Sequence, residues 1–337
     1  MGRLCLYGTV LNSADTVERS IRSVFRPDAD IVITDGGSRD GTYKRLLEIS
    51  KDYNLRVYRA PGSSRGLGRQ LALMRCPEGS YTAYFDLDNE YNVYWHRSID
   101  WGVATGSPRP LLHLYSREYL LSRGGWRDLN YAEDIELWAR VGFDYYLPVV
   151  FGRPIKIVGT GLLGREASRY FQGITRFAKR TLRTSLDIIR GLGLKPIDLV
   201  KLYDKSRLPL LLPAYIIATL QGIYRYDKFL NNFELIFYNS LKKLKDPVKE
   251  VKADEQYVVF AVPCRVAYHI CVGIGVSWID RRLRAIGLRP YRCRQMDWGE
   301  SIVGVRSLNA IEAINDYLHF NLFEAQSCRP LEAAEER

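Results

Sequence analysis

Short apolar segments alternate with amphipathic ones through the first 90 residues, and this alternation restricts the fold more than any other feature of the chain. The strands predicted from apolar runs are residues 4–10, 30–34, 55–58 and 81–85. Between them we predict a helix capped at Asn12 or Ser13, a helix at 43–53, a Gly- and Ser-rich loop at 60–68 and a helix at 70–75. This order predicts an α/β fold with a doubly wound, mostly parallel sheet, which binds ligands beyond the carboxyl ends of its strands.

The fourth predicted strand ends at two carboxylates, Asp86 and Asp88, which are separated by one residue. Alternate side chains of an extended chain share a face, so these two can converge on one point past the strand. Mg²⁺ and Mn²⁺ usually take one or two protein carboxylates and complete their coordination with water and phosphate. The pair is therefore a candidate divalent-metal site, and an Asp-rich turn after a strand is the alternative.

Other polar and glycine-rich motifs follow the predicted strands at the same edge of the sheet. Asp35 and Gly36 end the second strand, and Arg65 and Gly66 lie in the predicted loop after the third. Glycine lets the backbone approach a ligand closely, and helix amino termini favour phosphate. We therefore expect these residues to line one crevice, whereas residues 35–42 alone could also be a turn that satisfies its own backbone.

A second acidic pair lies farther along the chain. The triplet Gly124-Gly125-Trp126 ends a predicted helix at 116–123, and the next helix is predicted over residues 131–140. Glu133 and Asp134 lie in the first turn of that helix, where the field of the helix amino terminus stabilises negative charge. That position explains them structurally, and the functional alternative makes one of them a general base.

Together these motifs resemble the family 2 glycosyltransferases, which are inverting enzymes with the GT-A fold. Order and rough spacing match over residues 4–150, somewhat under half of the chain. The motifs that carry the resemblance are Gly8–Asn12, Asp35–Ser38, Asp40–Thr42, Arg65–Arg69, Asp86–Asp88, Gly124–Trp126, and Glu133-Asp134 with Leu137 and Arg140. The resemblance implies a hexosyltransferase-like enzyme that uses a nucleotide-sugar donor, a divalent metal (Mg²⁺ or Mn²⁺) and one in-line displacement.

The resemblance also implies a role for individual residues. The donor-binding residues would be Thr9, Asn12, Asp35, Gly36, Arg65, Gly66 and Asp86, with Thr9 and Asp35 near the base and Arg65 and Gly66 near the ribose and diphosphate. Asp88, together with Asp86, would bind the metal. Asp134 would deprotonate the acceptor with Glu133 beside it, and Trp126 and Arg140 would lie on the acceptor side.

Only 45 positions separate Asp88 from Glu133 (133 − 88), which is short for this family, so part of the usual acceptor-binding insertion is missing. This departure concerns the acceptor side and leaves the donor side intact. His96 and His113 fall within the shortened segment, and we interpret each as a packed or surface histidine in preference to a metal ligand.

The net charge of +11 comes entirely from residues 151–250, which hold 19 Lys and Arg against 8 Asp and Glu. Residues 168–190 predict a basic amphipathic helix, and the uncharged residues 208–224 are short for a membrane span and contain two prolines. We therefore expect a peripheral protein at the inner, anionic face of the cell membrane, with a polyprenyl phosphate acceptor, as in relatives of dolichyl-phosphate sugar synthases, or a glycan acceptor. A helix packed on the catalytic domain with a solvated basic face is the alternative.

Two other functions compete with glycosyl transfer. A sugar-phosphate nucleotidyltransferase would also use a doubly wound sheet with metal-binding carboxylates, but the segment 8–12 lacks its Gly-rich, Lys- or Arg-bearing signature. A nucleic-acid-binding protein could use the basic middle third, but the sequence has no recognised binding motif, so no nucleic-acid partner is expected.

The predicted domains are a catalytic domain at 1–155, a basic helical region at 156–250, a small α/β module at 251–328 and a tail at 329–337. In the small module we expect strands at 257–262, 289–295 and 301–306 and helices at 266–286 and 308–320, after a linker at 246–255. The six cysteines form no metal-binding spacing and the amino terminus resembles no export signal, so we expect reduced thiols in a cytoplasmic protein.

Overall fold

The computed structural model describes about two thirds of the chain. The described residues are 3–131, 133–144, 152–155, 174–193, 208–223, 260–263, 284, 288–295, 299–305, 307–318, 321 and 323–331. The predicted linker at 246–255 lies outside these residues, as does the predicted helix at 266–286 apart from residue 284. None of the helices in this part of the chain has the length and apolar character needed to cross a bilayer.

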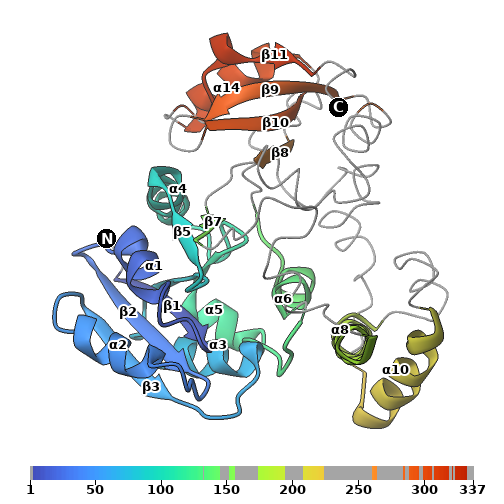
Figure 1. Cartoon of the computed structure of the whole chain (residues 1–337). Coiled ribbons are helices and arrows are strands. Elements are labelled where there is room, and N and C mark those ends of the chain that lie inside the picture. Colours follow the sequence, from blue (N-terminus) through green and yellow to red (C-terminus); the bar gives the residue numbers. More distant parts are fainter. Residues whose placement is uncertain are drawn as a thin grey trace.

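A five-stranded sheet organises the amino-terminal part of the chain, with strand order β3-β2-β1-β4-β6. Figure 1 labels β1, β2 and β3 of this sheet. The first four strands in sequence are parallel and β6 runs antiparallel to β4. The strands are β1 (Leu4–Val10), β2 (Ala29–Asp35), β3 (Leu55–Arg59), β4 (Tyr81–Tyr84) and β6 (Leu114–Ser116). The predicted mostly parallel α/β sheet is confirmed.

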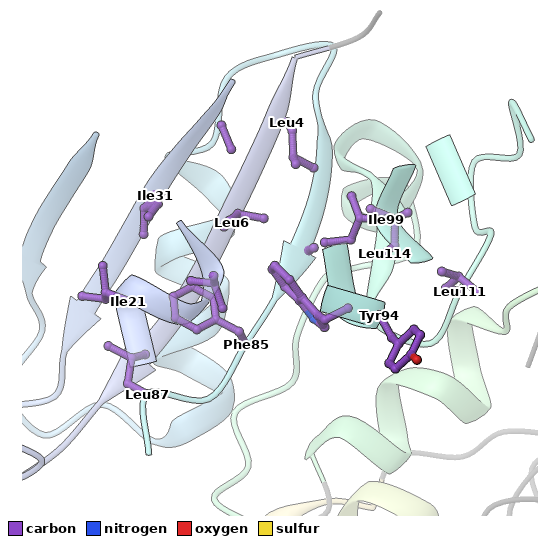
Figure 2. Close-up of a cluster of buried hydrophobic side chains, with 14 of the residues drawn as sticks. Leu4, Leu6, Ile21, Ile31, Phe85, Leu87, Tyr94, Ile99, Leu111 and Leu114 are labelled. Carbon is purple, nitrogen blue, oxygen red and sulfur yellow. The ribbon is translucent and has the colours of Figure 1, made fainter. Parts of the chain in front are cut away.

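Alternation along β1 divides the core between the two faces of the sheet. Leu4 and Leu6 pack with the helices α1 (Val17–Val24) and α2 (Thr42–Ile49), in the cluster that Figure 2 shows. Cys5 and Tyr7 point to the other face, where α3 (Arg65–Met74), α5 (Arg117–Ser122) and α6 (Glu133–Val141) contribute buried residues. Because both faces are covered, β1 and β2 are buried along almost their whole length.

The helix α3 begins earlier than the sequence predicts. The side chain of Ser64 accepts a hydrogen bond from the N–H of Leu67 and caps the helix, so α3 includes Arg65, Gly66 and Gly68. The predicted loop at 60–68 is therefore wrong in its second half. Two glycines near the start of the segment lowered its apparent helix propensity, but close packing against other elements requires both of them.

Further elements follow β4, and two of them form a separate two-stranded sheet. After β4 come β5 (Asn89–Tyr91) and α4 (Val93–Ala104), which the sequence reasoning did not predict. The strand β5 pairs antiparallel with β7 (Gly152–Pro154). The side chain of Asn92 accepts a hydrogen bond from the N–H of Trp95 and caps α4.

Two helices of the basic region follow, α8 (Ile174–Leu192) and α10 (Leu208–Gln221). Asp187 of α8 accepts a hydrogen bond from the N–H of Asn130, at 3.0 Å, and so joins α8 to the segment before α6. The buried residues of α10 are Leu211, Ala214 and Ala218. Most of the predicted amphipathic helix at 168–190 is thereby confirmed as helical, whereas residues 168–173 lie outside the described part.

The carboxyl-terminal part contains a second sheet, with strand order β11-β9-β10-β8 (Figure 1). Its elements are β8 (Phe260–Pro263), β9 (Arg289–Gln295), β10 (Gly299–Val305), α14 (Asn309–Leu318), the 3₁₀ turn η4 (Ala325–Ser327) and β11 (Arg329–Pro330). These positions agree closely with the strands predicted at 257–262, 289–295 and 301–306 and with the helix predicted at 308–320. The boundaries of the domains stay predictions.

Four cysteines are paired, which contradicts the prediction of reduced thiols. Cys5 of β1 is bonded to Cys76, just after α3, and Cys293 of β9 is bonded to Cys328. The partners of the two pairs lie 71 and 35 residues apart in sequence, so no local sequence motif identifies them. The prediction failed because short cysteine spacings identify metal and redox motifs, but they say nothing about partners that the fold brings together.

Candidate active site

The predicted ligand residues lie at the carboxyl ends of the parallel strands. In the β1–β2 pairing, Val10 is opposite Asp35, and Asp35 ends β2. In the β1–β4 pairing, Tyr7 is opposite Tyr84, so Asp86 and Asp88 follow β4 at the same edge. This edge is where a doubly wound sheet binds ligands, as the sequence predicts.

Asp35 is fully buried at this edge, and one of its two carboxylate oxygens accepts hydrogen bonds from the loop that follows. Its Oδ1 accepts hydrogen bonds from the N–H groups of Gly37 and Ser38, at 2.9 and 3.0 Å. Its Oδ2 is buried and has no hydrogen-bond partner among the described residues. A buried carboxylate oxygen without a partner is costly, so Asp35 is suited to accept a hydrogen bond from a ligand or an ordered water.

Asn12 and Thr9 hold the loops at this edge together. Asn12 adopts a left-handed backbone conformation, with φ of 54°. Its side-chain oxygen accepts a hydrogen bond from the N–H of Arg39, at 2.9 Å. The Thr9 hydroxyl donates to the carbonyl of Thr34, at 3.0 Å. Both predicted donor-binding side chains therefore have structural partners, and their contact with a ligand stays a prediction.

Gly66 and Gly68 let α3 approach its neighbours closely. The N–H of Gly66 donates to the carbonyl of Leu129 at 2.8 Å, and a Cβ at Gly66 would lie 1.9 Å from the carbonyl oxygen of Arg127. A Cβ at Gly68 would lie 2.2 Å from the Thr9 hydroxyl oxygen. Glycine is therefore required at both positions, and the amino terminus of α3 is fixed between β1 and the segment that leads into α6.

Arg69 lies at the centre of the site and contacts acidic residues on both sides. Its Nη2 donates to Oδ1 of Asp86 at 2.5 Å, and its Nη1 donates to Oε1 of Glu133 at 2.8 Å. The guanidinium lies over the rings of Tyr84 and Trp126, at 4.9 and 4.7 Å from their centroids. One arginine thus connects the loop after β4 with the start of α6, from inside an aromatic pocket.

The charges in this cluster shift one another's pKa. Burial lowers the pKa of Arg69, but the charges of Asp86 and Glu133 outweigh burial and raise it overall. Burial raises the pKa of Glu133, and Arg69 opposes that shift. The pKa of Arg65 is raised because Glu133, Asp86 and Asp88 outweigh the effect of burial. The positive charge of Arg65 therefore interacts with acids of both pairs, and Asp88 is close enough to take part.

Asp86 and Asp88 can supply only some of the ligands that a divalent cation needs. The Asp86 side chain is 45% exposed and Asp88 is exposed, so both can be reached from solvent. Arg69 already occupies Oδ1 of Asp86. Within the described ranges, no group of three or more His, Cys, Asp or Glu residues could hold a metal ion. Two accessible carboxylates fit Mg²⁺ or Mn²⁺ if phosphate and water supply the other ligands.

The comparison with known families agrees with this geometry. The family model described as glycosyl transferase family 2 matches residues 9–99, which include the end of β1, the strands β2 to β4, Arg69 and both carboxylates of the DLD motif. This part of the chain belongs to glycosyl transferase family 2. The chain is accordingly a glycosyltransferase, and the predicted family is confirmed. A search of curated protein sequences found no match.

Solved structures with similar folds include two forms of TarS from S. aureus. TarS itself is 15% identical with a TM-score of 0.40, and the match covers 69% of this chain and 55% of TarS. TarS 1-349 in complex with UDP-GlcNAc is 14% identical with a TM-score of 0.42, and the match covers 72% of this chain and 76% of that one. At these values the likeness concerns the fold alone.

A third similar structure is the mannosyltransferase PcManGT from Pyrobaculum calidifontis in complex with GDP-Man and Mn²⁺. It is 15% identical with a TM-score of 0.39, and the match covers 66% of this chain and 76% of that one. Each of these similarities extends beyond residues 9–99 of the glycosyltransferase, but none assigns it a sugar.

On the predicted acceptor side of the glycosyltransferase, Trp126 and Arg140 have structural partners. Trp126 is buried, and its indole N–H donates to the Tyr7 hydroxyl at 2.9 Å. Arg140 pairs with the buried Glu136 at 2.6 Å and donates to the carbonyl of Gly125. The two residues therefore hold the turn at 123–126 against α6, and a direct contact with an acceptor stays a prediction.

The two histidines of the shortened segment are packed, as the sequence suggests. His113 is buried and stacks on Trp95, with centroids 6.2 Å apart, and burial lowers its pKa to about 3. A ring nitrogen of His96 lies 2.9 Å from the carbonyl oxygen of Ser23.

Arg69 is the important residue that sequence reasoning passed over. In the sequence it is only the last residue of the Arg65–Arg69 motif, with no role of its own. A signal was present, because an arginine four positions after Arg65 lies on the same face of a helix. That signal could not be used while residues 60–68 were interpreted as a loop.

Proposed function

We propose that this glycosyltransferase transfers a sugar from a nucleotide-sugar donor to a hydroxyl or phosphate group, with inversion at the sugar carbon. The observation that carries the proposal is the arrangement around Arg69. It brings the carboxylate of Asp86 and the acidic first turn of α6 to one guanidinium. An inverting transfer needs a departing diphosphate on one side of the sugar and a proton acceptor on the other.

Donor binding would use the loops at the edge of the sheet. Asp35 offers Oδ2 as a hydrogen-bond acceptor to the base, since this buried oxygen has no other partner among the described residues. Arg65 is 54% exposed at the start of α3 and offers a cation to the diphosphate. Gly36 keeps the backbone accessible, because even a Cβ at this position would meet no atom closer than 3.5 Å.

Asp88 and the remaining oxygen of Asp86 would hold the divalent cation against the diphosphate. When bound there, Mg²⁺ or Mn²⁺ would neutralise negative charge on the leaving group. Arg69 fixes the orientation of the Asp86 carboxylate through Oδ1.

The difference in burial between the two neighbouring acids of α6 supports different roles for them. Glu133 has a side chain that is only 2% exposed and is held by Arg69, so it cannot reach a substrate. Asp134 is half-buried and is thus the more exposed acid of the pair, which favours it as the group that meets an acceptor. We therefore assign the general base to Asp134 and make Glu133 the residue that anchors the helix. Of the two catalytic residues that the sequence predicts, the proposal keeps Asp134 as the base.

Transfer would be tested by a thermal-shift screen of UDP- and GDP-sugars with and without Mn²⁺, followed by transfer assays with the stabilising donor. Asp88→Asn and Asp134→Asn should each abolish transfer and leave the fold intact. Asp52→Asn is the matched control, because Asp52 is exposed at the opposite edge of the sheet, before β3. Retained turnover in either site variant would remove that residue from its role. A product with the donor's anomeric configuration would exclude inversion.

We also propose that the enzyme works as a peripheral protein at the anionic inner face of the membrane, on a lipid-linked acceptor such as a polyprenyl phosphate. The support is an apolar stripe on α10, where Leu212, Ile216 and Leu220 are 65, 52 and 82% exposed. On α8, which packs against α10, Lys179 and Arg183 are exposed. An exposed apolar stripe and exposed cations on two helices that pack together suit the headgroup region of an anionic bilayer.

Vesicle flotation tests this second proposal. The protein should float with phosphatidylglycerol vesicles and not with phosphatidylcholine vesicles, and Leu212→Asn/Leu220→Asn should lose binding. Leu47→Asn is the matched control, since Leu47 is an exposed leucine on α2, at a distance in sequence from this stripe. Wild-type protein that stays unbound would favour a glycan or another acceptor in solution. Salt-sensitive retention on nucleic acid without vesicle binding would favour the nucleic-acid alternative.

A further inference from the structure

Arg69 joins two carboxylates that belong to different elements and to different halves of the proposed reaction. Its side chain is 2% exposed. Asp86, in the loop after β4, lies on the donor and metal side, and Glu133 begins α6, which carries the proposed base. The role that we assign to this buried connection rests on the proposed function.

The guanidinium has little freedom to move. The rings of Tyr84 and Trp126 lie within 4.9 Å of it, and Trp126 is itself fixed by hydrogen bonds to Tyr7 and Gln70. The helix that carries Arg69 is fixed by the close approach of Gly66 and Gly68 to their neighbours. The position of Arg69 is thus determined by packing and does not depend on its two acidic partners.

Asp86 is fixed by its contacts on both main chain and side chain. Its N–H donates to the Tyr91 hydroxyl at 2.8 Å, and its carbonyl accepts from the Ser20 hydroxyl at 3.0 Å. Arg69 then determines which way the carboxylate points, because it binds Oδ1 at 2.5 Å. A cation bound to Asp86 would therefore lie close to a positive charge that cannot move away.

Glu133 has fewer contacts. Its Oε1 lies 2.8 Å from Arg69 and 3.4 Å from Arg65, and its Oε2 is buried without a hydrogen-bond partner among the described residues. The Arg65 contact is the longer one, and the Arg65 side chain is 54% exposed. Arg69 is therefore the main polar anchor of the first turn of α6.

We propose that Arg69 is a positioning residue that connects the metal side to the acceptor side through Glu133. It holds the first turn of α6, and hence Asp134, at a fixed place relative to Asp86. Its charge also opposes a cation at Asp86, and Glu133 offsets that opposition. A change at Glu133, which is not a proposed metal ligand, should thus alter the affinity of the site for the metal.

The two arms of this connection predict shifts of opposite sign in Mn²⁺ affinity. Glu133→Gln removes one of the negative charges that offset Arg69 beside Asp86, so Mn²⁺ should bind about threefold more weakly or worse. Arg69→Met removes the cation, so Mn²⁺ should bind about threefold more tightly or better. Both variants release α6, so both should lower kcat by about tenfold or more, since small misplacements of a reacting group are costly.

Mn²⁺ affinity would be measured by electron paramagnetic resonance, with UDP or GDP at saturation according to the thermal-shift screen. The matched control is Arg75→Met, because Arg75 is exposed at the carboxyl-terminal cap of the same helix and stacks on Tyr58, away from both carboxylates. In the control, kcat and Mn²⁺ affinity should stay within about twofold of the wild type, as is usual for surface changes. A purely structural role for Arg69 would lower kcat without producing shifts of opposite sign.

The absence of either shift, a kcat that Arg69→Met leaves unchanged, or a wild type that binds no Mn²⁺ overturns the proposal. If Arg69→Met fails to fold, Arg69→Met/Glu133→Gln removes both buried charges and takes its place. The double variant should bind Mn²⁺ more tightly than Glu133→Gln alone, and equal or weaker binding overturns the proposal. A wild type that transfers no sugar from any donor refutes the proposed function, whereas the Mn²⁺ shifts test the connection separately.

Discussion

The disulfide between Cys5 and Cys76 should contribute a large part of the stability of the sheet. It connects β1, at the centre of the sheet, to the turn after α3, and both cysteines are buried. Reducing this bond in the intact chain, or replacing both residues in Cys5→Ala/Cys76→Ala, removes a crosslink that spans 71 positions of sequence. The effect should appear in the free energy of unfolding, because a crosslink acts mainly by restricting the unfolded chain.

The magnitude follows from the length of the loop that the bond closes. Chain entropy for a loop of this size gives about 4 kcal/mol at 25 °C. The bond between Cys293 and Cys328 closes a loop about half as long, from a separation of 35 positions. By the same relation it should contribute about 0.6 kcal/mol less. The two bonds therefore provide matched variants whose effects should be similar in size and ordered by loop length.

Urea unfolding of wild-type protein, Cys5→Ala/Cys76→Ala and Cys293→Ala/Cys328→Ala tests this prediction, with and without dithiothreitol. Reductant should lower the stability of each protein that retains a disulfide. Titration of thiols in denatured, unreduced protein should find no more than two of the six cysteines reactive. Six reactive thiols, or a midpoint for wild-type protein that reductant does not move, would refute the reasoning.

Two further predictions concern residues around the site. Burial lowers the pKa of His113 to about 3, so between there and the unfolded value of about 6.5 only the unfolded chain takes up the proton. The contribution of neutral His113 to the free energy of unfolding should therefore be fully present above pH 6.5 and fall by about 2 kcal/mol at pH 5. Urea unfolding above pH 6.5 and at pH 5 measures this loss, and His113→Gln should remove it. Gly66→Ala should cost about 1–3 kcal/mol or more and reduce transfer, because the new Cβ would lie 1.9 Å from the carbonyl oxygen of Arg127; unchanged stability and activity would show that α3 and the segment before α6 are not in close contact.

The parallel sheet could be predicted from sequence because its signals are local. The strands β1, β2 and β4 are mostly apolar and end at a turn or polar motif, whereas β3 carries two arginines. Parallel order follows once helices separate the strands. The edge that carries Asp35, Asp86 and Asp88 follows from the same alternation. Two short elements, β5 and β7, have only three residues each, which is too few for any periodicity to appear.

The features that sequence reasoning missed depend on pairs that are distant in sequence. Cys5 and Cys76 meet because β1 and α3 pack together, and no spacing rule contains that contact. Arg69 reaches Glu133 across 64 positions. Gly66 and Gly68 lower helix propensity locally, yet α3 forms because its packing requires their small size, so tertiary contacts outweighed propensity.

The acidic pair of α6 can have both a structural and a catalytic role, because its two residues lie in different surroundings. Successive residues of a helix point about 100° apart, so Glu133 and Asp134 cannot share one environment. Glu133 is buried against Arg69, and this ion pair determines how the first turn of α6 is rotated. Once that rotation is set, Asp134 is directed to a half-buried position beside the same site. Glu133→Gln should therefore impair transfer by misplacing Asp134, whereas Asp134→Asn should impair it by removing the base. The charge of Glu133 acts on Arg69 more strongly than that of Asp134, so Glu133→Gln should weaken Mn²⁺ binding more than Asp134→Asn does.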